Sequence, residues 1–225
     1  MTKEIMLSLD LETMDTGPEA AVLAIGARIF TIDGPSKGFE VFINQGLAAQ
    51  FGTTSMDTIK WWNKQDPLVY EQVFGGKLHP ADAVHQFMQF VSVHAPETVW
   101  ANSPSFDCTI LRHLCKQVNL TFPFHFTMER DFRTLFAMGR DLDINTRDCW
   151  KDIRAHLPLD DATAQAKAGA KILTHIYGPA EPTVYTTAPT VSTTEAPADP
   201  GSDRPSTASE QKSRGRASSQ PATAK

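Results

Sequence analysis

The stretch LSLDLETM (residues 7–14) carries two acids, one residue apart, inside an apolar run that is typical of a buried strand. Side chains alternate between the faces of a strand, so Asp10 and Glu12 are expected on one face and Leu9 and Leu11 on the other. Bare carboxylates on a core strand are costly to bury. This cost disappears if the two acids bind cations. Alternatively, the acids lie at a solvent-exposed strand end, where water solvates them and no cation is needed.

The composition suits one domain with an appendage. The chain has 225 residues, of which 41% are hydrophobic and 21% charged, so most of it can bury a core. Its net charge of −5 argues against nucleic-acid binding through a broad basic face, but not against phosphate binding through bound cations. The N-terminal sequence MTKEIMLSLDLET predicts neither a signal peptide nor a membrane span.

The cysteines predict a reducing compartment. Their number is odd and none forms a CxxC pair, which supports neither a disulfide framework nor a zinc knuckle. The three are Cys108, Cys115 and Cys149. The cytosol is therefore the simpler expectation.

The composition changes near residue 179. From there to residue 225, Pro, Thr, Ala and Ser dominate and no hydrophobic periodicity is present. Such a segment cannot bury enough apolar surface to offset its ordering entropy. We therefore predict a folded domain over residues 1–178 and a disordered tail over residues 179–225. The basic KSRGR (212–216) leaves open a docking segment for an acidic partner or nucleic acid.

The periodicity of residues 1–178 predicts strands first, then strands alternating with helices. Strands are predicted over residues 4–11, 20–32, 38–44 and 98–101. DGPSKG (33–38) is predicted to turn the second strand into the third as a hairpin. Helices are predicted over residues 54–65, 79–95, 105–117, 130–140 and 160–177. Asp160 or a neighbour is expected to cap the last helix. This order implies a mixed α/β sheet with helices on its faces.

A third acid follows a short apolar strand. WANSPSFD (100–107) places Asp107 just inside a helix, an arrangement typical of sites at the carboxyl end of a sheet. Taken alone, Asp107 could serve only to stabilise the helix dipole.

A histidine and a fourth acid precede the last helix. HLPLDDATAQA (156–166) places His156 five residues before Asp161, where small side chains allow that helix to pack closely. Histidine is suited to take a proton near neutral pH. Taken alone, these residues could be a capping acid and an incidental loop histidine.

Together, in this order and spacing, the segments resemble the three motifs of the DEDDh 3′→5′ exonucleases, which have a ribonuclease H-like fold. The motifs are Asp10-x-Glu12, Asn102-x-x-x-Phe106-Asp107 and His156-x4-Asp161. A finer resemblance, to phage exodeoxyribonuclease A and mycobacterial 3′→5′ exoribonuclease-like proteins, rests on TIKWWNKQ (58–65), WANSPSFDCTILRH (100–113) and RDFRTL (130–135). The likeness covers about residues 4–177. Ser103 departs from it, since such proteins more often have Gly there.

The resemblance implies a mixed five-stranded sheet flanked by helices and a metal-dependent 3′→5′ exonuclease. Asp10, Glu12, Asp107 and Asp161 would hold two divalent cations, Mg²⁺ or Mn²⁺, with His156 as general base. The expected reaction releases nucleoside 5′-monophosphates from single-stranded 3′ ends, with DNA slightly favoured over RNA. A bacterial or phage-infected cytoplasm is the expected location.

The resemblance also suggests residues that contact the substrate. They are Thr13, Trp61, Trp62, Gln65, Asn102, Phe106 and Arg133. Adjacent tryptophans cannot share one helix face, so one is expected in the core while the other could stack on a base. Phe106 fits either a core position or a support for the terminal nucleotide. Arg133 fits a phosphate contact or an ion pair with Asp131 or a metal-site acid.

Several alternatives stay open at this point. An endonuclease, or an exoribonuclease acting on RNA ends or oligomers, would use the same fold, because selection of the 2′-hydroxyl cannot be deduced from one sequence. A non-catalytic end-binding module would be expected to lack one of the five motif residues, and none is missing. Several relatives are dimers that complete each other's substrate groove, but no residue establishes whether this chain forms a homodimer.

Overall fold

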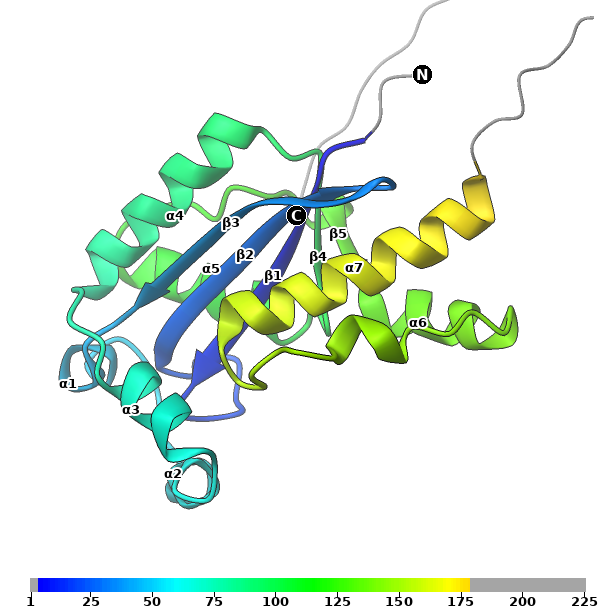
Figure 1. The fold of residues 1–225 in the computed structure, drawn as a ribbon. Helices are drawn as coiled ribbons and strands as arrows, with labels where there is room; N and C mark the ends of the chain where they lie inside the picture. The colour runs from blue at the N-terminus through cyan, green and yellow to red at the C-terminus, as the bar shows by residue number, and fades with distance from the viewer. Residues whose placement is uncertain (1–3, 179–225) are drawn as a thin grey trace, which may run out of the picture. The chain divides into compact units, whose positions relative to one another are not determined.

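The computed structural model describes residues 4–178, in which five strands form one sheet in the order β3-β2-β1-β4-β5 (Figure 1). The strands are β1 (Met6–Thr13), β2 (Val22–Thr31), β3 (Gly34–Phe42), β4 (Thr98–Ala101) and β5 (Glu129–Asp131). The first three are antiparallel, whereas β4 runs parallel to β1 and β5 parallel to β4. The predicted mixed five-stranded sheet is thus confirmed.

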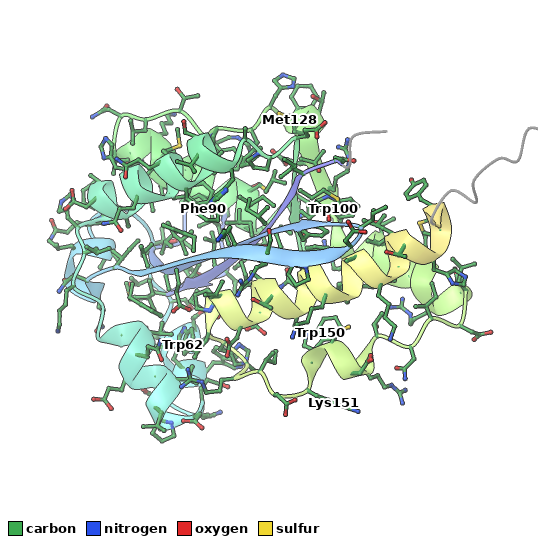
Figure 2. The ribbon with its side chains drawn as sticks, turned by 45° about the horizontal axis from the view of Figure 1, so that its top comes forward. Trp62, Phe90, Trp100, Met128, Trp150 and Lys151 are labelled. Carbon is green, nitrogen blue, oxygen red and sulfur yellow. The ribbon has the colours of Figure 1, made fainter. Side chains whose placement is uncertain are left out.

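Helices cover both faces of this sheet (Figure 1). They are α1 (Gln45–Ala48), α2 (Met56–Trp62), α3 (Pro67–Phe74), α4 (Pro80–His94), α5 (Asp107–Gln117), α6 (Phe132–Asp141) and α7 (Pro158–Tyr177), with short 3-10 helices η1 (Phe126–Met128) and η2 (Arg147–Trp150). Helices α4 and α5 pack on one face, and α6 and α7 on the other. In Figure 2, Phe90 lies on the α4 side of the sheet and Trp150 on the α7 side.

Strand β1 is central because it is apolar and paired on both sides. Leu7 and Leu9 are fully buried, and β2 and β4 flank the strand. Asp10 lies opposite Gly26 of β2 in the register. A Cβ atom at Gly26 would lie 2.2 Å from the backbone carbon of Pro158, so only glycine lets the start of α7 approach the sheet this closely. That approach brings the first turn of α7 to the end of β1.

Two local predictions need correction. The hairpin is present, but its turn spans only residues 32–33, because Thr31 already pairs with Gly34 at the start of β3. Gly34 has φ +123°, which glycine adopts without strain. The N-cap of α7 is Leu157, not Asp160, which instead accepts a hydrogen bond from the backbone N–H of Arg154.

Several segments lack a strong hydrophobic period and were not predicted. These are α1, α3, η1, η2 and strand β5. Of the described helices, none is both long and apolar enough to cross a membrane. All three cysteines are buried and free. The predicted tail, residues 179–225, lies outside the described residues.

Candidate active site at the carboxyl end of the sheet

Four acids meet where β1 and β4 end. Asp10 and Glu12 come from β1, Asp107 is the first residue of α5, and Asp161 lies in the first turn of α7. The backbone N–H of Leu11 donates to Oδ1 of Asp107 at 3.2 Å, which joins α5 directly to β1 between the two strand acids. The carboxyl ends of adjacent parallel strands therefore form the site, as the spacing of the motifs predicts.

Burial raises the pKa of both strand acids well above their usual values. For Asp10 the next causes are the charges of Asp107 and Asp161, and a hydrogen bond from Gln165 acts in the opposite direction. For Glu12, which is only 7% exposed, the other three acids add to the effect of burial. The two carboxylates therefore lie in a shared field of negative charge.

Burial also dominates at Asp107, whose pKa rises to about 7 although backbone hydrogen bonds and the charge of Arg133 favour its ionised form. Burial likewise raises the pKa of Asp161. Within residues 4–178, neither these two acids nor Asp10 and Glu12 form an ion pair with a lysine or arginine. Like charges held together without a counter-charge are stable only when protonated or when cations bind between them.

His156 lies directly beside the acids. Its backbone N–H donates to Oδ2 of Asp161 at 2.7 Å, and its φ of 68° is in the left-handed region that non-glycine residues rarely adopt. One side-chain ligand atom each from Glu12, His156 and Asp161 lies within 4.8 Å of the others. A set dominated by carboxylate oxygens suits hard divalent cations.

The tryptophans of α2 form a wall beside His156. The ring of Trp61 lies 4.9 Å from the imidazole, centroid to centroid, in an edge-on arrangement, and Trp62 lies at 6.2 Å. Trp62 is buried and its indole N–H donates to the carbonyl of Thr13 at 2.9 Å, whereas Trp61 is 42% exposed. One tryptophan is therefore in the core and the other faces outward, as their adjacent positions require.

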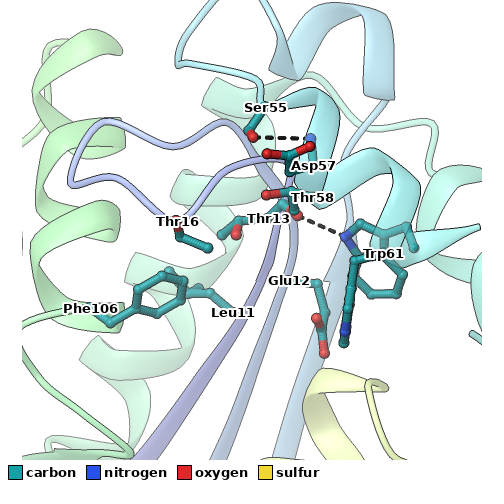
Figure 3. Close-up of a pocket in the computed structure, with 10 residues that line it drawn as sticks. Leu11, Glu12, Thr13, Thr16, Ser55, Asp57, Thr58, Trp61 and Phe106 are labelled. Atoms are coloured by element: carbon teal, nitrogen blue, oxygen red, sulfur yellow. Dashed lines mark hydrogen bonds between the residues drawn. The ribbon is translucent and has the colours of Figure 1, made fainter. Parts of the chain in front are cut away.

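A pocket of about 540 Å³ opens between β1, α2 and the start of α5 (Figure 3). Figure 3 shows Glu12 between Phe106 on one side and Trp61 on the other. The lining residues are Leu11, Glu12, Thr13, Thr16, Ser55, Asp57, Thr58, Trp61, Trp62 and Phe106. A pocket of this size holds a small ligand such as a nucleotide.

Three of the residues suggested as substrate contacts do not line this pocket. Gln65, which lies just after α2, donates through its side-chain amide to the carbonyl of Trp61. Asn102 is exposed. Arg133 pairs with Asp131 at 3.4 Å, which is one of the two roles considered for it.

The sequence motifs also did not include several polar neighbours of the candidate site. Gln165 donates its amide N–H to Oδ1 of Asp10 at 2.9 Å. Its position four residues after Asp161, on the same helix face, is a signal that could have identified it. The polar pocket residues Ser55, Asp57 and Thr58 carry no such signal, because they reach the site only through the packing of α2 against β1.

Comparison with known proteins agrees with this geometry. A sequence model of the Rv2179c-like 3′–5′ exoribonuclease domain matches residues 5–173. No curated protein sequence matches the chain.

Solved structures show the same fold. The nuclease domain of 3′hExo, a DEDDh family member bound to rAMP, is similar with a TM-score of 0.55 and 11% identity over 77% of this chain and 94% of that one. Cell-death related nuclease 4 (CRN-4) has a TM-score of 0.54 and 15% identity over 78% of this chain and 64% of that one.

Exonuclease I of E. coli, solved with a dT13 oligonucleotide, has a TM-score of 0.54 and 13% identity over 76% of this chain. The match spans only 41% of exonuclease I. The likeness to solved nucleases establishes the ribonuclease H-like fold. Since the family model covers most of residues 4–178, the chain belongs to the Rv2179c-like 3′–5′ exoribonuclease domain family and is a 3′–5′ exonuclease.

Proposed function

We propose that the protein hydrolyses the terminal phosphodiester at the 3′ end of single-stranded RNA and releases nucleoside 5′-monophosphates. The observation that carries this proposal is the group of four acids beside His156. Two of them are buried and two half-buried, and none forms an ion pair with a lysine or arginine in the part of the chain that the structure describes. RNA replaces the slight preference for DNA expected from the sequence, because the matching family is described as an exoribonuclease domain.

The donor set supports divalent cations, Mg²⁺ or Mn²⁺, as cofactors. Asp10, Glu12, Asp107 and Asp161 offer hard oxygen ligands, and their buried negative charge needs a counter-charge. Two cations bound to these acids would offset the charge of the scissile phosphate and lower the pKa of the attacking water. Asp10 is our candidate for the ligand shared by both, since its neighbours Asp107 and Asp161 come from different helices.

We assign His156 the role of general base. Its backbone N–H is already bound to Asp161, and neither ring nitrogen has a hydrogen-bond partner among residues 4–178. The imidazole is thus free to take the proton of the water that attacks the phosphate. Asp161 fixes the backbone of the loop, and the ring of Trp61 limits where the imidazole can move.

The pocket is our candidate for the site of the terminal nucleotide. Phe106 and the exposed Trp61 lie on opposite sides of Glu12, so a base or sugar between them would place its phosphate near the acids. Stacking on an aromatic ring tolerates any base, which suits an enzyme that removes residues in turn. Thr13 and Thr58 add hydroxyl groups to the same pocket.

DNA is the second candidate substrate, because E. coli exonuclease I, which has the same fold, was solved with dT13. The test uses 5′-labelled RNA and DNA strands of one sequence, each incubated with Mg²⁺, with Mn²⁺ or with EDTA. The proposal expects a ladder that shortens from the 3′ end, faster on RNA, and only with metal. Faster shortening of DNA would support the second candidate, and internal cuts or metal-independent cleavage would contradict both.

We also propose the binding partner, the location and the oligomeric state of the protein. Single-stranded 3′ ends are the proposed partners, and a bacterial or phage-infected cytoplasm is the proposed location, which the three buried free cysteines support. We also propose a homodimer, following the resemblance to dimeric relatives. Light scattering on the purified protein measures its mass and would contradict the dimer if it gave 24.8 kDa, the mass of one chain.

A further inference from the structure

Gln165 extends from α7 into the group of acids. Its Nε2 donates to Oδ1 of Asp10 at 2.9 Å, and the residue is only 5% exposed. It follows Asp161 by four residues, so both side chains project from the same face of α7. None of the three exonuclease motifs includes this position.

The packing of α7 does not explain a glutamine here. Oε1 of Gln165 is buried without a hydrogen-bond partner, and within residues 4–178 only Oγ of Ser8 shares this condition among side-chain atoms. A half-satisfied buried amide is worse for folding than an apolar side chain of similar size. The adjacent residues Ala164 and Ala166 are completely buried, which shows that this part of α7 packs in an apolar environment. What the glutamine provides is its bond to Asp10.

We propose that Gln165 is a positioning residue for Asp10, whose amide fixes Oδ1 so that Oδ2 is presented to a divalent cation. This inference rests on the proposed function, because it assumes that Asp10 binds metal. An ionised carboxylate only accepts hydrogen bonds, so the amide N–H group is the suitable partner. Groups that orient a metal ligand typically change metal affinity or activity by about 10–100-fold when they are removed.

Mn²⁺ binding to the full chain without nucleic acid tests this inference. The loss of the free-ion EPR signal measures affinity for the wild type, Gln165→Met and Gln165→Leu, with Asp10→Asn as the positive control. We expect both Gln165 variants to weaken Mn²⁺ binding about 10–100-fold. In strand digestion, kcat should fall by a similar factor while KM for the strand stays within twofold, because Gln165 lines no part of the pocket.

Ser8→Ala is the matched control. Ser8 is fully buried, also has an unpartnered side-chain atom, and lies two residues before Asp10 on the same face of β1. Its removal should leave Mn²⁺ affinity and kcat unchanged. In EDTA, Gln165→Met removes a buried carbonyl without a partner but also the donor to Asp10, so its melting temperature serves only to show that the variant folds.

The outcomes separate this inference from the proposed function. If the wild type does not bind Mn²⁺, or if Asp10→Asn binds it as well as the wild type, the proposed function fails. If Asp10→Asn weakens binding but both Gln165 variants stay within twofold of the wild type, only the positioning role is wrong, whatever their melting temperatures. If either apolar variant does not fold, Gln165→Glu replaces the donor by an acceptor and must weaken Mn²⁺ binding for the inference to stand.

Discussion

The acids of the candidate active site and the ion-paired acids elsewhere in the domain are stabilised in opposite ways. The paired acids lie beside basic residues, as in Arg112–Glu129, Arg133–Asp131, Arg154–Asp160 and Lys171–Asp148. A hydrogen bond from Lys171 holds the pKa of Asp148 below its usual value, whereas burial raises the pKa of Asp10. The difference supports a functional site, because the paired acids each have a basic partner, whereas within residues 4–178 the group that would bind cations has none.

Removing one acid from each group gives the largest expected contrast. Asp10→Ala should abolish turnover, a loss of more than about 10⁴-fold, because cations supply several kcal/mol of transition-state stabilisation. Its circular dichroism spectrum should match the wild type. Asp148→Ala, which breaks the exposed pair with Lys171, should keep activity within twofold. Strand digestion with Mg²⁺ measures both, and a similar loss in the two variants would remove the distinction between the groups.

The next largest effect is expected at the histidine that joins the active-site acids. His156→Ala should slow the chemical step by about 10²–10³-fold, the contribution of a general base, while Mn²⁺ binding is largely kept. Single-turnover digestion measures the first and EPR titration the second.

His125→Ala is the control for this variant, because His125 caps η1, away from the acids. Its digestion rate should equal that of the wild type. Digestion by His156→Ala at the wild-type rate would show that the general-base assignment is wrong.

The pH dependence of stability is expected to show an effect of intermediate size. Burial raises the pKa of Asp107 from 3.8 to about 7, and the other three acids shift in the same direction. A raised pKa means that the folded protein keeps a proton that the unfolded chain releases, so this contribution to stability is complete below about pH 4 and is lost as pH rises through 7. In EDTA, the melting temperature should therefore fall between pH 5 and pH 8.

Two measurements sharpen the pH test. Added Mg²⁺ should raise the melting temperature more at pH 8 than at pH 5, because protons and cations compete for the same oxygens. Asp107→Asn should flatten the fall in EDTA, since its side chain no longer titrates. A wild-type melting temperature that rises from pH 5 to pH 8 in EDTA would contradict the shared negative field.

Much of the fold could be predicted because it depends on local patterns. The apolar alternation of β1 and the small side chains of α7 are visible in the sequence, and both place acids at the end of the sheet. Strand β5 could not be predicted, because Glu129–Asp131 is short and polar and is a strand only through its pairing with β4. The early end of the hairpin turn likewise depends on the pairing of Thr31 with Gly34.

The candidate site also has a part that could be predicted from the sequence and a part that could not. The motif residues could be predicted from their resemblance to a known family, but the pocket wall depends on the contact between Trp62 and Thr13, which are 49 residues apart. Gln65 was predicted to contact the substrate, yet its side chain donates a hydrogen bond to the carbonyl of Trp61. The direction in which such a side chain points depends on tertiary packing, which local sequence patterns do not reveal.

Arg133 connects the two groups of acids and gives the smallest expected effect. It pairs with Asp131, but its charge also lowers the pKa of Asp107. Because the side chain of Arg133 is 59% exposed, Arg133→Gln should change the free energy of unfolding by less than about 1 kcal/mol and KM by less than about threefold. The pH at which stability falls in EDTA should move upward, since the ionised form of Asp107 loses a favourable charge. Arg133→Lys should restore it, and a rise in KM above tenfold would instead make Arg133 a phosphate contact.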